Sequence, residues 1–310
     1  MSSPFHVGEQ SVQTRAGVRE KAEQIGSRVI RSSFMPEQHR EFFAQLPALL
    51  VAAVDSEGQP HASILCGAAG FAWSPHPALL CVGARPQIDD PIASLLQPRA
   101  AVGLLGLEWP TRRRNRMNGR IVESDERGFS VAVAQSFGNC TKYIQARDWQ
   151  ATPRLPGLML KGDGLDEQWL GLVQAADTLF IASQSSDPQG GGVDISHRGG
   201  PAGFIEVGRD GRLWIPDYSG NRLFNTLGNL LRDPRCGLLL IDFSSGDLLH
   251  LQARAEVVWP EQYAALGVTP PPGAERMLAL TPGRWMLRRS RLPLAFASPQ
   301  FSPFLPKAGV

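Results

Sequence analysis

One segment of the chain combines a tight turn with a group of hydrogen-bond donors. It runs from Asp217 to Asn229, follows an apolar run and continues in a helical pattern. Gly220 is expected to form the turn, with Asn221, Arg222 and Asn225 at the start of the helix. The free N–H groups and the dipole of a helix start attract anions, and an arginine can hold a phosphate through two hydrogen bonds. The segment is predicted either to bind phosphate or only to begin a helix, with its asparagines as caps and Arg222 in solvent.

Two further stretches carry side chains that bind anions. Ser196-His197-Arg198 precedes two glycines, and Arg198 is placed to reach the same anion as Arg222. The stretch 111–120 reads Thr-Arg-Arg-Arg-Asn-Arg-Met-Asn-Gly-Arg, which on a strand puts Arg112, Arg114 and Arg116 on one face. This strip is expected either to bind phosphate, substrate carboxylates or RNA, or to be an exposed strand whose charges discourage edge pairing. A net charge of only +2 and the lack of interleaved aromatic residues argue against nucleic acid.

Metal and nucleophile motifs are not found. The four cysteines are scattered, with no C-x-x-C pair, so we predict no metal site. Cys140 lies two residues before Lys142, which leaves open either a thiol of lowered pKa or an ordinary buried cysteine. The chain also lacks a G-x-S-x-G motif and a Gly-Lys-Ser/Thr phosphate loop.

The elements that position these residues occur twice. Gly67 to Phe71 corresponds to Gly199 to Phe204, and the sequence around Pro98-Arg99 to that around Pro234-Arg235. A short amphipathic helix precedes each copy, at 36–46 and at 166–173. The chain therefore holds two copies of a unit of roughly 100 residues, built mainly of short strands. In the first copy the counterpart of the 217–229 turn is 85–91, whose two aspartates would repel an anion.

Length and composition agree with two mainly β domains. The chain has 310 residues, 43% of them hydrophobic and 19% charged, with 32 glycines and 25 prolines. We assign residues 1–150 to an N-terminal domain with a leading helix, 151–164 to a linker, and 165–310 to a C-terminal domain. The Pro-rich tail after Val258 is expected to be irregular, with a helix near 274–280. Since we find neither a secretory signal nor an apolar run of about 20 residues, we expect a cytoplasmic protein without membrane contact.

The motifs of the second copy resemble the pyridoxamine 5′-phosphate oxidase-like, FMN-binding split-barrel family. The resemblance is carried by 196–204, 213–217, 220–222, 227–229 and 233–239, together with 136–140 and 143–145 of the first copy. It implies a mainly β fold with flanking helices: two tandem six-stranded Greek-key split barrels packed as an intramolecular pseudo-dimer, with FMN between them. The residues that the resemblance assigns to the cofactor are Ser196, His197, Arg198, Asp217, Asn221, Arg222, Asn225, Ser136 and Asn139.

The activity that the resemblance implies is hydride or electron transfer through FMN. The substrate would be NAD(P)H or a small organic molecule, and the protein would be a monomeric pseudo-dimer or a homodimer. The alternative is a non-catalytic protein that binds a flavin, a deazaflavin or haem, with His197 or His250 as the haem ligand. No side chain is assigned a catalytic role.

Overall fold

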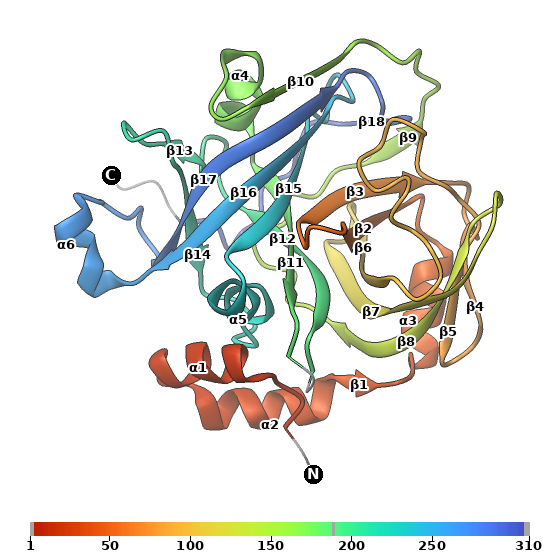
Figure 1. Cartoon of the computed structure of the whole chain (residues 1–310), viewed down its shortest axis with the longest axis horizontal. Helices are drawn as coiled ribbons and strands as arrows, with labels where there is room; N and C mark the ends of the chain where they lie inside the picture. The colour runs from red at the N-terminus through yellow and green to blue at the C-terminus, as the bar shows by residue number, and fades with distance from the viewer. Residues whose placement is uncertain (1–2, 188–189, 307–310) are drawn as a thin grey trace.

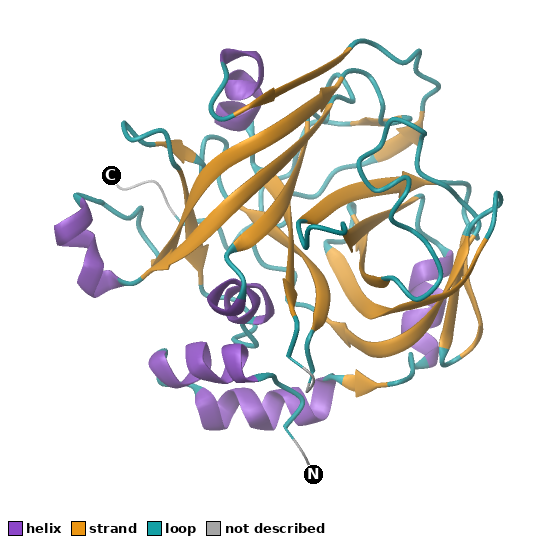
Figure 2. Cartoon of the chain, in the orientation of Figure 1, coloured by secondary structure: helices purple, strands orange, loops and turns teal. Residues whose placement is uncertain are grey.

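Two curled β-sheets lie side by side in the computed structural model, which describes residues 3–187 and 190–306 (Figure 1). Strands dominate both halves, and the helices lie at their margins (Figure 2). In the first half the helices are α1 (Val7–Arg15), α2 (Arg19–Val29) and α3 (Glu37–Ala44). Its sheet contains β1 (Arg31–Ser32), β2 (Ala48–Val54), β3 (Pro60–Cys66), β4 (Ala72–His76), β5 (Leu79–Val82), β6 (Ala101–Glu108), β7 (Arg113–Ser124) and β8 (Phe129–Gly138).

The second half repeats this arrangement. Its sheet contains β10 (Met159–Asp163), β11 (Thr178–Ser185), β12 (Gly192–Gly199), β13 (Glu206–Val207), β14 (Leu213–Tyr218), β15 (Arg235–Ile241), β16 (Leu248–Val258) and β17 (Ala274–Arg288). Its helices are α4 (Glu167–Ala175), α5 (Asn225–Arg232), the 3-10 helix η1 (Pro260–Gln262) and α6 (Tyr263–Leu266). A separate two-stranded sheet joins β9 (Trp149–Ala151) to β18 (Leu294–Phe296).

The predicted duplication is confirmed by strand topology. The first sheet has the order β3-β2-β6-β7-β8-β5-β4 with β1 on β8, and the second has the order β12-β11-β15-β16-β17-β14-β13 with β10 on β17. When nine is added to each strand number of the first sheet, the result is the strand order of the second sheet, so each strand has a counterpart in the other half. Pair registers also correspond: Leu104 faces Met117 and Leu238 faces Leu251. The fold is therefore two tandem split barrels, as expected, although each sheet has eight strands and not the expected six.

The two barrels share a core. Apolar side chains of β2, β3 and β6 form one buried cluster with those of β11, β12 and β15, and Leu50, Leu105, Phe180 and Leu239 in it are fully buried. Glycines bring the backbones close together. A Cβ on Gly237 would lie 2.3 Å from the carbonyl oxygen of Pro60, and one on Gly103 would lie 2.9 Å from Cα of Asp194. Because the two glycines occupy corresponding positions in the repeat, the contact between the barrels has approximate two-fold symmetry.

The C-terminal region differs from the prediction. Residues 274–288, expected to be irregular with a helix near 274–280, form the long strand β17, which pairs with both β14 and β16. The predicted linker 151–164 contains β10, which pairs with the end of β17. In both places pairing with distant strands outweighs the local signal of prolines and glycines. The last four residues of the tail lie outside the described residues.

The N-terminal helices extend across to the second barrel. Helix α1 packs on α5, and a Cβ on Gly8 would lie 2.3 Å from the carbonyl oxygen of Gly228 (Figure 1). This close contact places the side chains of α1 beside the predicted phosphate turn. Among the described residues no helix is long and apolar enough to cross a membrane.

Candidate functional site

Eight of the nine residues assigned to the cofactor line one pocket between the barrels, with a volume of about 90 Å³. These eight are Asn139, Ser196, His197, Arg198, Asp217, Asn221, Arg222 and Asn225. Arg114 and Arg116 of the first barrel complete its wall. We call this space the anion pocket, because four guanidinium groups, those of Arg114, Arg116, Arg198 and Arg222, face it.

The start of α5 forms one side of the anion pocket. Arg222 and Phe224 both adopt left-handed backbone conformations, with φ of +62° each, which turn the chain sharply after β14. Phe224 is the N-cap and supplies no side-chain acceptor to the first turn of α5. The first N–H groups of the helix therefore have no intrahelical partner and present a positive end to the pocket. Asn221 accepts a hydrogen bond from the backbone of Leu223 instead of capping the helix.

Arg116 crosses from β7 of the first barrel to this turn. Its guanidinium donates to Ser196 Oγ at 2.5 Å and to Asn225 Oδ1 at 3.1 Å, and it forms an ion pair with Asp194 at 2.8 Å. Burial lowers the pKa of Arg116, and Asp194 opposes that shift. A side chain of one barrel thus organises the helix start of the other, as a subunit contact would in a dimer.

Arg198 is held from behind. Asp217 accepts hydrogen bonds from Arg198 on one oxygen and from Arg276 on the other, the latter at 2.7 and 2.9 Å. Asp217 is 4% exposed, and both its oxygens are occupied. It therefore lines the pocket as a positioning residue for Arg198 rather than as a ligand group.

Several buried donors around the anion pocket have no partner among the described residues. They are Nε of Arg116, Nε of Arg198 and Nδ2 of Asn139. Arg222 also makes no hydrogen bond or ion pair within the described part of the chain. Unpaired buried donors also occur elsewhere in the described chain, for example Nε of Arg288 and of Arg291. What distinguishes the anion pocket is that several of them lie together with Arg222 around one space.

The charge balance of the pocket also indicates an anion. Burial, with smaller effects from Arg116 and Arg198, lowers the pKa of Arg114 to about 10. Its guanidinium donates to the carbonyls of Cys140 and His197, which are neutral acceptors. A bound anion would favour the charged form of all these groups and offset their mutual repulsion.

The loop after β8 closes the pocket. Asn139 accepts a hydrogen bond from Asn221 at 3.2 Å, and the Tyr143 hydroxyl donates to the carbonyl of Ser219 at 3.2 Å. The tyrosine ring also lies against Tyr218, with 5.1 Å between ring centroids. The first barrel therefore contributes to the turn of the second through this loop as well as through Arg116.

Two predicted members of the anion-binding set lie elsewhere. Ser136 is fully buried within the first barrel, where its hydroxyl donates to the carbonyl of Phe34 and lies 3.3 Å from His39. Arg112 precedes β7 and has a φ of +63°, so it does not share the face of Arg114 and Arg116. Its guanidinium donates to the carbonyls of Ile144 and Gln300.

The histidines considered for haem are both buried. The ring of His197 packs edge-on against Phe180, and burial lowers its pKa well below the ordinary value, so it is neutral. His250 lies on the opposite side of the barrel contact and shares a hydrogen bond with the carbonyl of Ala62 at 3.0 Å. The structure does not bring the two together.

A second space of about 250 Å³ adjoins the anion pocket and shares Asn225 with it. We call it the covered pocket, because α1 forms one wall with His6 and Glu9, opposite Asn118 and Gln135 of the first barrel. Burial raises the pKa of Glu9 to about 8. Its carboxyl group accepts hydrogen bonds from the His6 amide and from the Asn225 side chain.

Apart from Asn225, the residues that line the covered pocket belong to no motif that we recognised in the sequence. Asp194 lies two positions before Ser196 on β12, so strand alternation places both side chains on one face of the sheet. The assignment of Ser196 to the site could therefore have been extended to Asp194. No local sequence pattern points to Glu9, because Asn225, whose side chain it contacts, lies 216 positions away in the sequence.

Residues 165–288, which contain α4 and β11 to β17, match the family model described as pyridoxamine 5′-phosphate oxidase. The resemblance inferred from the sequence is thereby confirmed for the second barrel. None of the curated proteins compared with the chain matches it.

Solved structures similar to the chain cover a third to a half of it. A protein of Clostridium acetobutylicum related to general stress protein 26, of the pyridoxinephosphate oxidase family, has 15% identity and a TM-score of 0.29, covering 43% of this chain and 96% of its own. A FAD-binding protein of Mesorhizobium loti has 10% identity and a TM-score of 0.29, covering 43% and 99%. HupZ of Group A Streptococcus has 10% identity and a TM-score of 0.27, covering 34% and 94%.

Proposed function

We propose that this chain, whose second barrel is of the pyridoxamine 5′-phosphate oxidase type, binds FMN between its two barrels and acts as an oxidoreductase. The observation that carries the proposal is the convergence of Arg116, Arg198, Asn139 and Arg222 with the start of α5 on one space that suits a phosphate group. Within this group, Nε of Arg116, Nε of Arg198 and Nδ2 of Asn139 have no partner among the described residues. The family resemblance supplies the expectation of a flavin, and these donors fit its phosphate.

The covered pocket is the space that we assign to the flavin ring. It adjoins the anion pocket at Asn225, and its 250 Å³ are enclosed by polar side chains of both barrels and of α1. Asn118 and Gln135 offer amide donors and acceptors of the kind that orient a heterocycle. A bound flavin supplies the hydride and electron transfer, while the protein positions it and sets its electrostatic surroundings.

Glu9 is the titratable group of the covered pocket that suits proton transfer. Its pKa of about 8 keeps the carboxyl group protonated at neutral pH. A neutral acid beside a reacting ring can hold a proton that an anionic carboxylate would already have lost. We propose that Glu9 holds this proton, with Asn225 and the His6 amide fixing its position.

The test is the absorption spectrum of the protein as purified, followed by mass spectrometry of the small molecule released on denaturation. We expect a flavin spectrum and release of FMN. Bleaching of the flavin on anaerobic addition of NADH or NADPH would support oxidoreductase activity with that partner. A colourless protein that takes up no added FMN would contradict the cofactor, and a Soret band would identify haem instead.

A further inference from the structure

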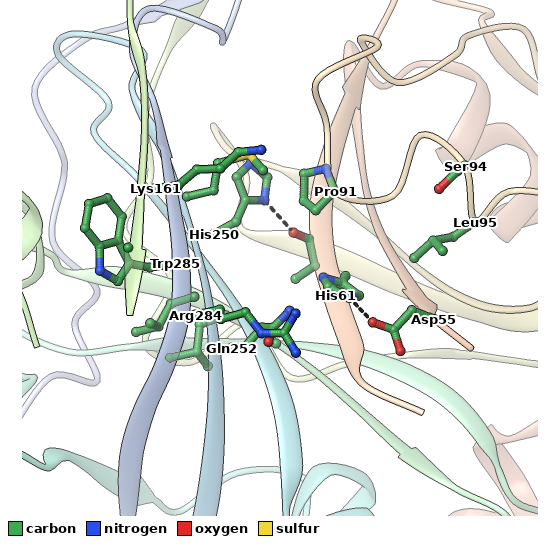
Figure 3. Close-up of a pocket in the computed structure, with 16 residues that line it drawn as sticks. Asp55, His61, Pro91, Ser94, Leu95, Lys161, His250, Gln252, Arg284 and Trp285 are labelled. Atoms are coloured by element: carbon green, nitrogen blue, oxygen red, sulfur yellow. Dashed lines mark hydrogen bonds and ion pairs between the residues drawn. The ribbon is translucent and has the colours of Figure 1, made fainter. Parts of the chain in front are cut away.

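The repeat creates a second groove on the other side of the barrel contact, with a volume of about 460 Å³ (Figure 3). We call it the open groove. His61 and Ala62 of β3 line one side, and His250 and Gln252 of β16 line the other. Lys161 and Arg284 of the second barrel extend over the groove toward the first barrel (Figure 3).

Strand registers identify the open groove as the counterpart of the covered pocket. Three lining positions of one correspond to three of the other: His61 to Asp194, Gln252 to Asn118, and Arg284 to Gln135. Corresponding strands of the two repeats, β3, β16 and β17 in one space and β12, β7 and β8 in the other, therefore form both spaces.

The open groove differs in what lies beside it. The counterpart of the anion pocket is filled by Arg288, which is 1% exposed and forms ion pairs with Asp89 at 2.6 Å and Asp90 at 2.7 Å. Gln87 accepts a third hydrogen bond from it at 2.7 Å. With two carboxylates in place, this position repels phosphate, as the sequence of the 85–91 turn predicted. A phosphorylated ligand cannot be anchored there as it is at the start of α5.

The charges of the open groove are nevertheless positive. Lys161 makes no hydrogen bond or ion pair within the described part of the chain. Arg284 reaches only Glu57, at 3.4 Å, and both side chains are about 70% exposed, so this pair contributes little. The one lining carboxylate, Asp55, is already paired with His61 at 2.9 Å.

Part of the remaining wall is apolar. Pro91 and Leu95 of the first barrel face Met286 of the second. Lys161 and the weakly paired Arg284, beside these apolar side chains, suit a ligand with a flat hydrophobic body and a single anionic group. No helix of the described chain lies over this groove as α1 lies over the covered pocket, and its lining includes no residue of α1 or α2.

We propose that the open groove binds an aromatic carboxylate, whose carboxylate pairs with Lys161 and Arg284 and whose ring lies against Leu95 and Met286. The site is separate from the anion pocket, so the proposal does not depend on the flavin. It assigns different ligands to two grooves of common origin. The first-barrel turn lost its affinity for phosphate, and the space beside it stayed open.

The test is a titration of the protein with salicylate, whose own fluorescence reports binding, carried out on the protein as purified and again in the presence of excess FMN. We expect saturable binding that inorganic phosphate does not displace. The double variant Lys161→Ala/Arg284→Ala should weaken it at least ~10-fold, the loss of about one charge-assisted contact. The matched control Lys21→Ala/Arg127→Ala removes the same charge from exposed positions elsewhere and should bind as the parent does.

One further variant separates the possible results. Ser94→Trp places an indole in the open groove and should abolish binding while FMN uptake continues. The proposal is overturned if the parent shows no saturable binding up to about 10 mM salicylate. Equal affinity in the Lys161→Ala/Arg284→Ala variant, or displacement by phosphate, would overturn it as well.

Discussion

Arg222 offers the most direct test of the phosphate assignment. It faces the anion pocket without a partner in the described structure, unlike Arg198, which Asp217 holds in place. Replacing Arg222 with Ala therefore breaks no ion pair. The backbone at this position has a φ of +62°, which alanine and arginine both adopt at similar cost, so the turn should persist.

The expected loss follows from the contact that Arg222 would make. A hydrogen bond to a charged group contributes about 1.5–3 kcal/mol, so Arg222→Ala should raise the Kd for FMN by roughly 10- to 150-fold. Binding is measured by the quenching of FMN fluorescence. Riboflavin, which lacks the phosphate, should bind the parent and the variant with equal affinity.

Comparing the two ligands makes the result specific. If FMN and riboflavin lose affinity equally, Arg222 supports the site as a whole and does not contact the phosphate. If neither loses affinity, the phosphate lies elsewhere and our assignment of the anion pocket is wrong. The exposed variant Arg127→Ala carries the same change of charge and controls for long-range attraction of the anionic ligand.

Three other perturbations test the fold and its electrostatics. Between pH 4.5, the ordinary pKa of a glutamate, and about pH 8, Glu9 keeps its proton in the folded protein but loses it in the unfolded chain. The free energy of unfolding should therefore fall as pH rises through this range, by up to ~1.4 kcal/mol per pH unit. In thermal melts, Glu9→Gln should flatten this pH dependence. Gly237→Ala should destabilise the fold by about 1–3 kcal/mol, because its Cβ clashes at the contact between the barrels. Gly171→Ala, in α4 with open space around it, should instead stabilise the fold by ~0.5–1 kcal/mol. Equal melting temperatures for the two variants would contradict the packing described for Gly237. Arg288→Met should cost about 3–5 kcal/mol in urea unfolding, because it leaves the buried Asp90 carboxylate without an opposite charge and hydrogen-bonded only to neutral donors. Adding Asp90→Asn should recover part of that loss, and additive losses would show that the pair is not coupled.

The sequence predicted the duplication because each copy repeats short apolar strands at nearly constant spacing. It also brought together residues of the anion pocket from separate segments, since the family motifs include the loop 136–145 as well as the 217–229 turn. The predicted position of Ser136 was wrong in detail. The strand β8 continues to Gly138, so Ser136 points into the first barrel and only Asn139, beyond its end, reaches the pocket.

The strand β17 could not be predicted from its own residues. Thr281, Pro282 and Gly283 interrupt its apolar pattern, and locally they favour a turn. The interruption falls where the register between β16 and β17 shifts, between Leu251 and Ala253. This irregularity accommodates the three residues, and the strand continues beyond them. Such a bulge depends on the partner strands, which lie far away in the sequence.

The divergence of the two turns has a consequence for the whole molecule. In a symmetric dimer one sequence must serve both grooves, so a residue that favours phosphate on one side favours it on the other. Fusion of the copies removes this constraint. Arg116 and its counterpart His250 occupy the same ladder position, yet one organises an anion pocket and the other lines the open groove beside Arg288. Because each half contributes side chains to both grooves, a substitution in one barrel changes the site of the other, and the two grooves could acquire different ligands without altering the shared core.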